Sequence, residues 1–314
     1  MLDLLIIGGA AAGSSAAIYA ARRKLNFKIV TDNIGGEVAL AGEVNNWPGT
    51  QNIQGFELAQ KFNEHVKSYG VEVDEGWRVE SVARAEGFFI VTAKNAKGEE
   101  NKYETKSVIV ATGIHPRHLR IPGEEEFARK GVTYCTVCDG PFFRGKTTVS
   151  IGGGNSVLES VIMMSGIAQK VYLLTIEPNT AEKKFGFPTG DDVLIDKVKS
   201  LPNVEIVYDA NTYEIFGDTK VRGLKYRDLT GEHDLVTDGI MIHVGMIPNA
   251  QFLDVEKDPI GQIIVDQKCR TSIPGIFAAG DVTNIPYKQI GVSAGQGIVA
   301  ALAAIEYLNK IPSV

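Results

Sequence analysis

Cysteine is scarce in this sequence, with three residues in 314, at positions 135, 138 and 269. A small, odd number excludes a fold held together by disulfides. Cys135 and Cys138 are separated by two residues, a spacing that in a reducing compartment indicates redox chemistry or a metal site. A structural zinc site needs four Cys or His ligands, and Cys269 and the five histidines supply no second pair at a fitting spacing. We therefore expect a redox pair, no metal, and an inert, partly buried thiol at Cys269.

Excess positive charge and long apolar runs are also lacking. The net charge is −6, which argues against nucleic acid as a partner because nucleic acid attracts basic surfaces. No uncharged apolar run approaches the roughly 18–20 residues that cross a bilayer. The N-terminus has no basic stretch of the kind that opens a signal peptide. We therefore expect no membrane partner and a cytoplasmic location.

Two stretches have the pattern of a nucleotide-binding strand, glycine turn and helix. The first has an apolar strand at Leu4 to Ile7, then glycines, an Ala-rich helix to Arg23 and a strand at Phe27 to Val30. The second has a strand at Thr147 to Ile151, glycines, a helix and a strand at Lys170 to Leu174. Two such openings in one chain predict an α/β protein with two doubly wound, Rossmann-like βαβ domains.

Stretches rich in β-forming residues, such as Arg78 to Val91 and Val221 to Arg227, predict small antiparallel β layers beside the main sheets. The last part of the chain has a strand from Ile276 and a closing helix from about Ser293 to Asn309. The simplest plan has one domain built from both ends of the chain, residues 1–115 and 244–314. A second domain, residues 116–243, is inserted between them and carries the Cys pair.

The segment Gly8 to Gly13 follows the first strand. In a dinucleotide-binding fold the first glycine makes the tight turn, the second admits the pyrophosphate, and the third packs helix on strand. The helix N-terminus then offers N–H groups to phosphate. Ala10 stands at the middle position, which weakens the signal, and Asp32 follows the second strand, where an acid would hold the ribose hydroxyls. A plain α/β turn is the alternative interpretation of this segment alone.

Further motifs follow in order along the chain. Apolar strands end at Ala111-Thr112-Gly113 and at Ala279-Gly280-Asp281. With these motifs the whole chain resembles the low-molecular-weight thioredoxin reductases and the related flavoprotein subunit of alkyl hydroperoxide reductase. The matching segments are Gly35-Gly36-Glu37, Asn46-Trp47-Pro48-Gly49, Ala111-Thr112-Gly113, Cys135-Thr136-Val137-Cys138-Asp139-Gly140, and Gly280-Asp281 with Tyr287-Lys288-Gln289.

The resemblance implies tightly but non-covalently bound FAD and a homodimer. It implies that Asp281 contacts the ribityl or pyrophosphate region and that Gln289 lies at the isoalloxazine. From the residues alone, Gly280 permits a turn and Asp281 supplies a hydroxyl acceptor at the carboxyl end of a strand, where such sheets bind ligands. A structural Gly-Asp turn is the alternative. The residues that the resemblance assigns to FAD are Gly8, Ala10, Gly13, Asp32, Gly36, Asn46, Ala111, Thr112, Gly113, Gly280, Asp281, Lys288, Gln289 and Ile290.

The segment from Cys135 to Asp139 is the predicted chemical centre. Two residues between the cysteines allow a reversible disulfide, and a helix N-terminus lowers the pKa of a thiol and prepares it for exchange. Asp139 adds a carboxyl group that can move the proton as the dithiol forms. The resemblance implies that Cys138 faces the flavin and that Cys135 attacks the disulfide of a thioredoxin-like protein.

The second glycine run, from Gly152, departs from the family pattern. Val157 stands where Gly or Ala is usual, and we expect a β-branched residue there to push the helix off the strand and crowd the phosphate site. No arginine lies between residues 144 and 222, so a bidentate clamp on a 2′-phosphate is missing. Lys183 and Lys184 offer only point charges. NADH is also poorly served, because Thr175 stands where its acid should be and Glu177 comes two residues later.

These departures make NADPH a doubtful donor and favour ferredoxin or another non-pyridine donor. We expect an FAD-dependent thioredoxin-disulfide reductase, in which electrons pass from the donor to FAD, to the Cys135–Cys138 disulfide and to a thioredoxin-like protein. One alternative is a flavin dithiol oxidase of the same fold, which needs no nicotinamide site. Another is a non-catalytic flavin redox sensor, but Asp139 argues against it because a sensor needs no acid beside its thiols.

Overall fold

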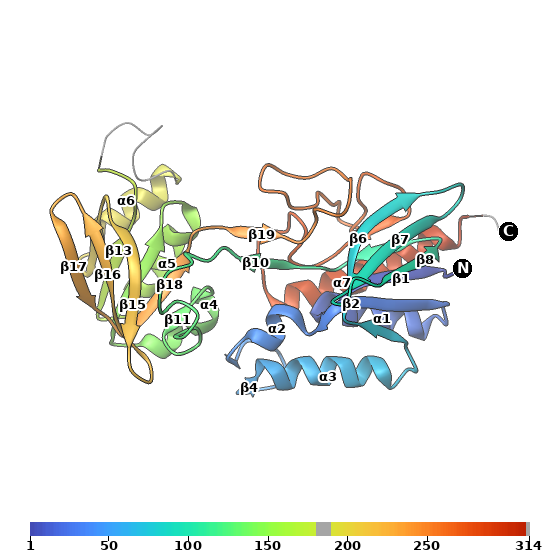
Figure 1. The fold of residues 1–314 in the computed structure, drawn as a ribbon, viewed down its shortest axis with the longest axis horizontal. Helices are drawn as coiled ribbons and strands as arrows, with labels where there is room; N and C mark the ends of the chain where they lie inside the picture. Colours follow the sequence, from blue (N-terminus) through green and yellow to red (C-terminus); the bar gives the residue numbers. More distant parts are fainter. Residues whose placement is uncertain (180–189, 312–314) are drawn as a thin grey trace. The chain divides into compact units, whose positions relative to one another are not determined.

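The computed structural model describes residues 1–179 and 190–311. The chain divides into unit 1, Met1–His115 with Ile247–Val314, and unit 2, Pro116–Met246. It passes between the units at β10 (Ile114–Pro116) and β19 (Met246–Pro248), which pair with each other (Figure 1). The sequence places the second boundary before residue 244. The structure keeps residues 244–246 in unit 2, where the Gly245 carbonyl accepts a hydrogen bond from the Arg117 N–H (2.9 Å).

A parallel sheet of five strands forms the centre of unit 1. In spatial order the strands are β20 (Ile276–Ala278), β9 (Val108–Val110), β1 (Leu4–Gly9), β2 (Phe27–Ile34) and β5 (Val73–Glu75). Short runs of Leu, Ile and Val build the inner strands, and their side chains are buried because a parallel sheet has both faces covered. β20 comes from the C-terminal part of the chain and pairs with β9, so the sheet closes only when both parts are present.

Unit 1 contains the helices α1 (Ala11–Arg22), α3 (Gly55–Lys67) and α7 (Ile290–Leu308), with the short α2 (Gly36–Leu40). α1 and α7 lie side by side (Figure 1), and small residues let them approach closely: a Cβ on Gly297 would come 2.0 Å from the Ala12 carbonyl oxygen. By length and composition α7 could span a bilayer, which the sequence alone does not lead us to expect. Its Ala-rich side is buried in the core of unit 1 with α1, as in the core helix of a globular domain.

Two small antiparallel layers complete unit 1. One consists of β6 (Trp77–Arg84), β7 (Phe89–Asn95) and β8 (Glu100–Thr105), and the other of β3 (Glu43–Val44) and β4 (Ile53–Gln54). Alternate side chains of β7 are buried against the central sheet, as expected for a strand with one covered face.

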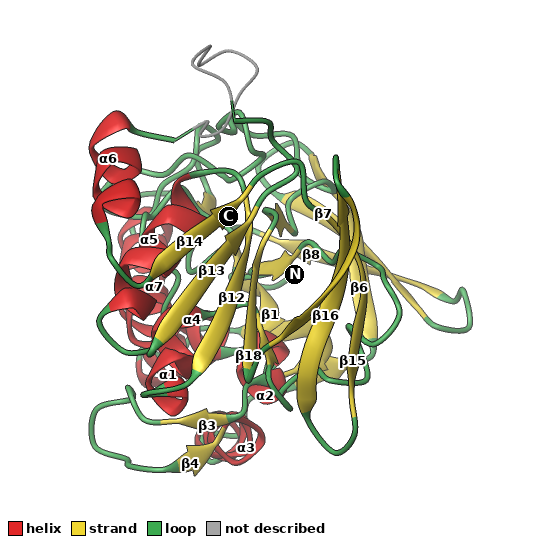
Figure 2. Ribbon diagram, turned by 90° about the vertical axis from the view of Figure 1, so that its left-hand side faces the viewer, coloured by secondary structure: helices red, strands yellow, loops and turns green. Residues whose placement is uncertain are grey.

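Unit 2 has a second five-stranded parallel sheet. Its order is β11 (Val132–Thr133), β18 (Gly239–His243), β12 (Thr147–Gly152), β13 (Lys170–Leu174) and β14 (Val204–Val207). Helices α5 (Asn155–Ser165) and α6 (Asp192–Ser200) cover one face of this sheet. The antiparallel strands β15 (Asn211–Gly217), β16 (Val221–Asp228) and β17 (Gly231–Val236) cover the other (Figure 2). The short helix α4 (Thr136–Asp139) and a 3₁₀ turn (Gly140–Phe143) follow β11.

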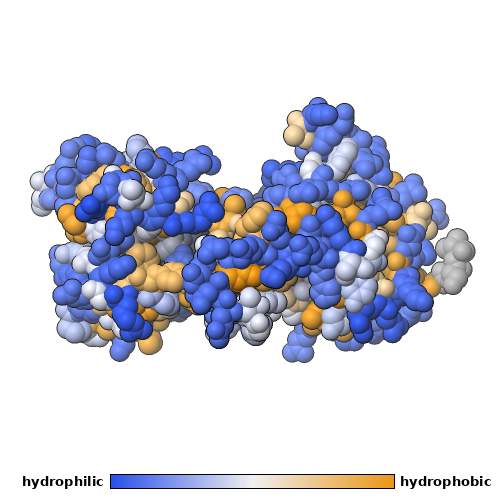
Figure 3. All heavy atoms as spheres, turned by 90° about the horizontal axis from the view of Figure 1, so that it is seen from below, coloured by the Kyte–Doolittle hydropathy of each residue, from blue (hydrophilic) through white to orange (hydrophobic). Residues whose placement is uncertain are grey.

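The predicted fold class is confirmed. Each unit has a parallel sheet that contains a strand, a glycine turn and a helix in succession, and each carries a small antiparallel layer. Hydrophilic residues predominate on the molecular face drawn in Figure 3, where hydrophobic residues form only scattered patches. The carboxyl ends of the parallel strands are where sheets of this kind bind ligands, so these edges are the places to look for the site.

Candidate active site

The glycine loop of unit 1 joins β1 to α1 and contacts the end of β9. Gly8 has a φ of +114°, and a Cβ there would lie 2.3 Å from the Ala111 carbonyl oxygen. A Cβ on Gly13 would lie 1.9 Å from the Gly8 carbonyl oxygen, so only glycine fits either position. Ala10 is the N-cap of α1 and makes no side-chain hydrogen bond to the first turn. The N–H groups of that turn are therefore available to an anion such as a pyrophosphate.

The end of β2 lies beside this loop. The Thr31 hydroxyl oxygen accepts a hydrogen bond from the Gly9 N–H (3.1 Å), which fixes the strand against the loop. Asp32, the next residue, is exposed. Gly36 has a φ of +49°, and a Cβ there would lie 3.5 Å from the Ala10 Cβ. The structure thus brings three of the predicted FAD residues to one edge of unit 1: Ala10, Asp32 and Gly36.

The end of β9 supplies a second part of this edge. Gly113 has a φ of +67°, and no heavy atom of the described residues lies within 4 Å of a Cβ added there, so its backbone is open to a ligand. Thr112 serves the fold: its hydroxyl donates to the Asn249 carbonyl (2.6 Å), and its carbonyl accepts from Asn249 Nδ2 (2.9 Å). Ala111, whose carbonyl limits Gly8, is buried.

Three polar residues after β20 form a partly buried group: Asp281, Lys288 and Ser293. The Ser293 hydroxyl donates to Asp281 Oδ1 (2.7 Å), and burial raises the pKa of Asp281, while the Ser293 hydrogen bond and Lys288 oppose the rise. Lys288 Nζ donates to the Thr283 carbonyl (2.6 Å), and burial lowers its pKa. At least one donor of Lys288 therefore serves the fold, whereas Asp281 keeps a carboxylate oxygen for a ligand hydroxyl.

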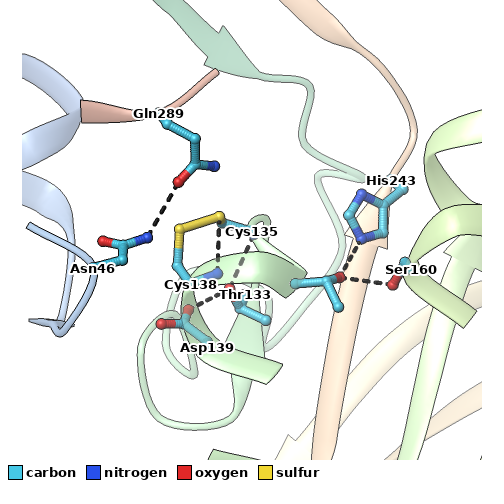
Figure 4. Close-up of a disulfide and its surroundings, with 9 residues drawn as sticks. Asn46, Thr133, Cys135, Cys138, Asp139, Ser160, His243 and Gln289 are labelled. Atoms are coloured by element: carbon cyan, nitrogen blue, oxygen red, sulfur yellow. Dashed lines mark hydrogen bonds between the residues drawn. A yellow bond between two sulfur atoms is a disulfide. The ribbon is translucent and has the colours of Figure 1, made fainter. Parts of the chain in front are cut away.

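Gln289 connects two distant segments of unit 1. It is the N-cap of α7, directly before Ile290, and its Oε1 accepts a hydrogen bond from Asn46 Nδ2 (3.1 Å; Figure 4). Taken together, the residues of unit 1 fit a dinucleotide such as FAD. The uncapped N-terminus of α1 and the partly exposed glycine backbone suit phosphates, and the carboxylates of Asp32 and Asp281 suit hydroxyl groups.

The cysteine pair of unit 2 follows β11. Cys135 and Cys138 form a disulfide with their Cα atoms 5.3 Å apart. Cys135 is the N-cap of α4, and its Sγ accepts a hydrogen bond from the Cys138 N–H (3.3 Å; Figure 4). The helix N-terminus that the sequence predicts is present, but the helix has four residues and its cap is Cys135. The Cys138 N–H stabilises negative charge on the Cys135 sulfur once the disulfide is reduced.

Asp139 ends α4 and is held by Thr133. The Thr133 hydroxyl donates to the Asp139 carboxylate, and its oxygen accepts from the Cys135 N–H (3.1 Å; Figure 4). Burial raises the pKa of Asp139, and the Thr133 hydrogen bond opposes that rise. A carboxyl group with a raised pKa is a better proton donor near neutral pH. The sequence does not single out Thr133, because nothing in the local pattern separates it from any other strand threonine.

The glycine loop of unit 2 lies between β12 and α5. A Cβ on Gly152 would come 2.3 Å from the His243 carbonyl oxygen, so the loop and the end of β18 are in close contact. Val157 is 0% exposed and packs in the core with α5, α6 and the sheet. The prediction that Val157 crowds the phosphate site is therefore wrong, because its side chain points into the core behind the loop.

Two carboxylates lie at this loop instead. Asn155, the first residue of α5, is paired with Asp191: its Oδ1 accepts from the Asp191 N–H (2.8 Å), and its Nδ2 donates to Asp191 Oδ2 (3.1 Å). Glu177 lies against Gly153, since a Cβ there would be 3.4 Å from Glu177 Cγ and 3.9 Å from Oε1. Negative charge at a helix N-terminus competes with a phosphate for the same place.

The residues after β13 bring Glu177 to the glycine loop, although the sequence places this acid two residues late. Thr175 is buried, and its hydroxyl oxygen accepts from the Glu177 N–H (3.2 Å). This turn carries Glu177 back to the glycine loop. Lys183 and Lys184 lie outside the described residues. Among residues 1–179 and 190–311, no group of three or more His, Cys, Asp or Glu is placed to hold a metal.

Comparison with known proteins places this arrangement in a family. Over residues 2–302 the sequence matches the family described as pyridine nucleotide-disulphide oxidoreductase. The chain belongs to this family. The oxidoreductase is 40% identical over 313 residues to an alkyl hydroperoxide reductase subunit of Pseudomonas putida and 40% identical over 312 residues to the NADH dehydrogenase of Bacillus subtilis. These matches cover 98% of this chain, which spans 58% and 59% of the length of those relatives.

Solved structures give the same result. The thioredoxin reductase of Streptococcus pyogenes is similar with a TM-score of 0.89 and 35% identity, covering 99% of each chain. A ferredoxin-flavin thioredoxin reductase from Clostridium acetobutylicum is similar with a TM-score of 0.52 and 30% identity, covering 98% of each chain. The resemblance to thioredoxin reductases is thereby confirmed. Membership of the family indicates FAD as the cofactor of this oxidoreductase, and the residues of unit 1 fit it.

Proposed function

We propose that this oxidoreductase is an FAD-dependent thioredoxin-disulfide reductase, which passes two electrons from a donor to the Cys135–Cys138 disulfide and then to a thioredoxin-like protein. The observation that carries the proposal is the disulfide at the N-cap of α4, with Asp139 held beside it by Thr133. A purely structural disulfide would need neither a capping N–H for a thiolate nor a buried acid with a raised pKa.

Cys135, Cys138 and Asp139 each have a defined task in this reaction. FAD, when bound, supplies the two-electron chemistry. Reduction of the disulfide breaks the S–S bond and takes up two electrons and two protons, one of which Asp139 can donate. Cys135 then attacks the partner disulfide as a thiolate, stabilised by the Cys138 N–H, and a mixed disulfide forms. Cys138 attacks the Cys135 sulfur of that mixed disulfide, which restores the disulfide of this chain and releases the partner as a dithiol.

For the donor, we propose a carrier other than NADPH. Asp191 and Glu177 lie at the glycine loop of unit 2, and the sequence has no arginine between residues 144 and 222. Glu177 supports NADH, because an acid at this loop can hold the ribose hydroxyls. The Asn155–Asp191 pair supports a donor that does not use the loop, such as reduced ferredoxin.

One experiment tests the function and the donor together. The purified flavoprotein is mixed anaerobically with NADPH, NADH or reduced ferredoxin, and bleaching of the flavin absorbance is followed. Each donor is then tested for reduction of a thioredoxin. Bleaching by NADPH that saturates at low micromolar concentration would refute the donor proposal. Oxygen consumption with a dithiol, without reduction of thioredoxin, would indicate a dithiol oxidase instead. We also propose a cytoplasmic homodimer, which light scattering and cell fractionation can check.

A further inference from the structure

A chain of hydrogen-bonding side chains runs from α4 into the interior of unit 2. Thr136 Oγ1 lies 2.8 Å from His243 Nε2 and 2.7 Å from Ser160 Oγ (Figure 4). Ser160 Oγ in turn lies 3.2 Å from Ser150 Oγ. The four residues come from four different elements, α4, β18, α5 and β12. The helix that carries both cysteines is thus fastened to two strands of the sheet and to the helix that covers them.

A helix of four residues needs such a connection. One turn is too short to be stable by itself, because its first hydrogen bond does not compensate for the conformational entropy lost when the backbone is fixed. Thr136, Ser160 and Ser150 are 4%, 3% and 0% exposed, so loss of one hydroxyl leaves a buried polar neighbour without a partner. Burial lowers the pKa of His243 to about 4, which keeps its ring neutral at pH 7. A neutral ring nitrogen can accept from the Thr136 hydroxyl, while Thr136 accepts from Ser160.

We propose that Thr136 and His243 are positioning residues that set the dithiol–disulfide equilibrium of Cys135 and Cys138. In the oxidised protein the S–S bond itself holds the two ends of the helix turn together. Reduction by two electrons and two protons breaks this bond. Among the described residues, the Cys138 N–H, 3.3 Å away, is then the donor that holds the Cys135 sulfur. The orientation of that N–H then depends on what anchors α4, which includes the Thr133–Asp139 hydrogen bond and, in the interior of unit 2, the Thr136 side chain with its partners.

The direction of the effect follows from this difference. Loss of the anchor weakens the hydrogen bond to the Cys135 thiolate and so destabilises the reduced protein more than the oxidised one. A redox pair whose reduced form is less stable is harder to reduce. We therefore expect Thr136→Val to lower the equilibrium constant for dithiol formation three- to tenfold against glutathione, which corresponds to a fall of about 15–30 mV in midpoint potential.

The experiment equilibrates the holoprotein in glutathione buffers, alkylates free thiols and counts them by mass spectrometry. Thr148→Val is the matched control: Thr148 is 0% exposed on β12, and its hydroxyl has no hydrogen-bond partner among the described residues. Thr148→Val should leave the equilibrium unchanged, and Thr136→Ser, which keeps the hydroxyl, should give the value of the unaltered protein. His243→Leu removes the acceptor of the Thr136 hydroxyl and should reproduce the shift of Thr136→Val. Ser160→Ala removes one partner of the Thr136 hydroxyl and leaves His243 as the acceptor, so it should shift the equilibrium less. It replaces Thr136→Val if that variant does not fold.

Equal equilibria for the Thr136→Val and Thr148→Val proteins, or a shift in Thr136→Val that Thr136→Ser does not reverse, would overturn the proposal. The inference rests on the proposed redox role of the pair but not on its partner. If the unaltered pair titrates with glutathione yet does not reduce thioredoxin, the proposed function fails and the positioning role is still decided. If the pair does not titrate at all, both fail.

Discussion

The glycine loops of the two units share a backbone plan but differ in the groups beside them. In each unit a threonine follows a loop glycine by 22 residues: Thr31 lies within β2 and Thr175 directly follows β13. In unit 1, Thr31 accepts a hydrogen bond from Gly9, and the N-terminus of α1 has no side-chain cap. In unit 2, Thr175 accepts from the N–H of Glu177 instead, and Asp191 is paired with the first residue of α5.

This difference shows that the scaffold and its charge are separate properties. The strand, turn and helix need only an apolar run, small residues at the turn and a helical face, and both units have them. Whether the turn accepts an anion depends on a few side chains around it. Neither helix N-terminus has a side-chain cap, but in unit 2 the carboxylates of Glu177 and Asp191 lie beside the loop. Unit 2 carries its sulfur chemistry after another strand of its sheet.

The assignment of sulfur chemistry to unit 2 is tested most strongly by replacing its cysteines. Cys135→Ser and Cys138→Ser should each lower turnover with thioredoxin by roughly 10³-fold or more, because no disulfide can form, while bound FAD is unchanged. Cys138→Ser should also accumulate a mixed disulfide through Cys135, visible on a non-reducing gel. Cys269→Ser is the control. Burial raises the pKa of Cys269 to about 11, so it is protonated at pH 7 and its loss should not matter. An active Cys138→Ser protein would refute the assignment.

Replacement of Asp139 should have a smaller effect on turnover than replacement of either cysteine. Asp139→Asn should lower turnover by about 10²-fold, as loss of a proton donor does. The free energy of unfolding of Asp139→Asn at pH 7 should not fall with the turnover. Because the folded pKa is raised, protonation stabilises the fold below the ordinary value of 3.8, and this contribution is lost as the pH rises through the folded pKa. At pH 7 the buried carboxylate destabilises the fold, so the free energy of unfolding of Asp139→Asn, measured in urea, should equal or exceed that of the unaltered protein. Asp196→Asn, on the exposed side of α6, should change neither quantity.

His243 gives unit 2 a pH dependence of its own. Its pKa is lowered from 6.5 to about 4, so the unfolded chain binds a proton more readily than the folded chain between these values. Stability should therefore fall as the pH drops from 6.5 to 4, by up to about 1.4 kcal/mol per pH unit. Hydrogen exchange of unit 2 amides, followed between pH 6.5 and 4, measures this fall in the free energy of unfolding. In His243→Gln the slope should be shallower, whereas the exposed His65→Gln should keep it. Equal slopes in all three proteins would contradict the assignment.

The charges at the unit 2 loop should have the smallest effect. Asp191→Asn should tighten binding of NADH and NADPH about three- to fivefold, since one like charge near a phosphate at a solvent-accessible site is worth about 1 kcal/mol or less. Glu177→Gln should favour NADPH over NADH, because it removes both a repulsion and a ribose acceptor. Calorimetric titration of each nucleotide measures both effects, with Asp196→Asn as the control. Tighter FAD binding in either variant would show that the two loops are not independent.

Local patterns predict the backbone of this protein well. The two βαβ openings follow from apolar runs that end in glycines, and the predicted bounds of β13 agree with the structure residue for residue. The amphipathic helix α3 is not among the predicted elements. Side-chain partners are beyond reach: Asn155 and Asp191 are 36 residues apart, and Thr136 and His243 are 107 apart. The Thr136–His243 pair exists because the sheet order places β18 between β11 and β12, and no short segment encodes a sheet order. The prediction for Val157 fails because a sequence position does not reveal which way the side chain points.

The split of unit 1 between the two ends of the chain affects how the protein is made. A ribosome synthesises β1, β2, β5 and β9 long before β20 and α7. Until those last elements emerge, β9 has an unpaired edge and the apolar face of α1 has no cover. Unit 2 is continuous and can complete its own sheet first. A released chain that ends near residue 250 should therefore hold one protease-resistant module and one open sheet, and that open sheet is the state most exposed to strand-edge aggregation.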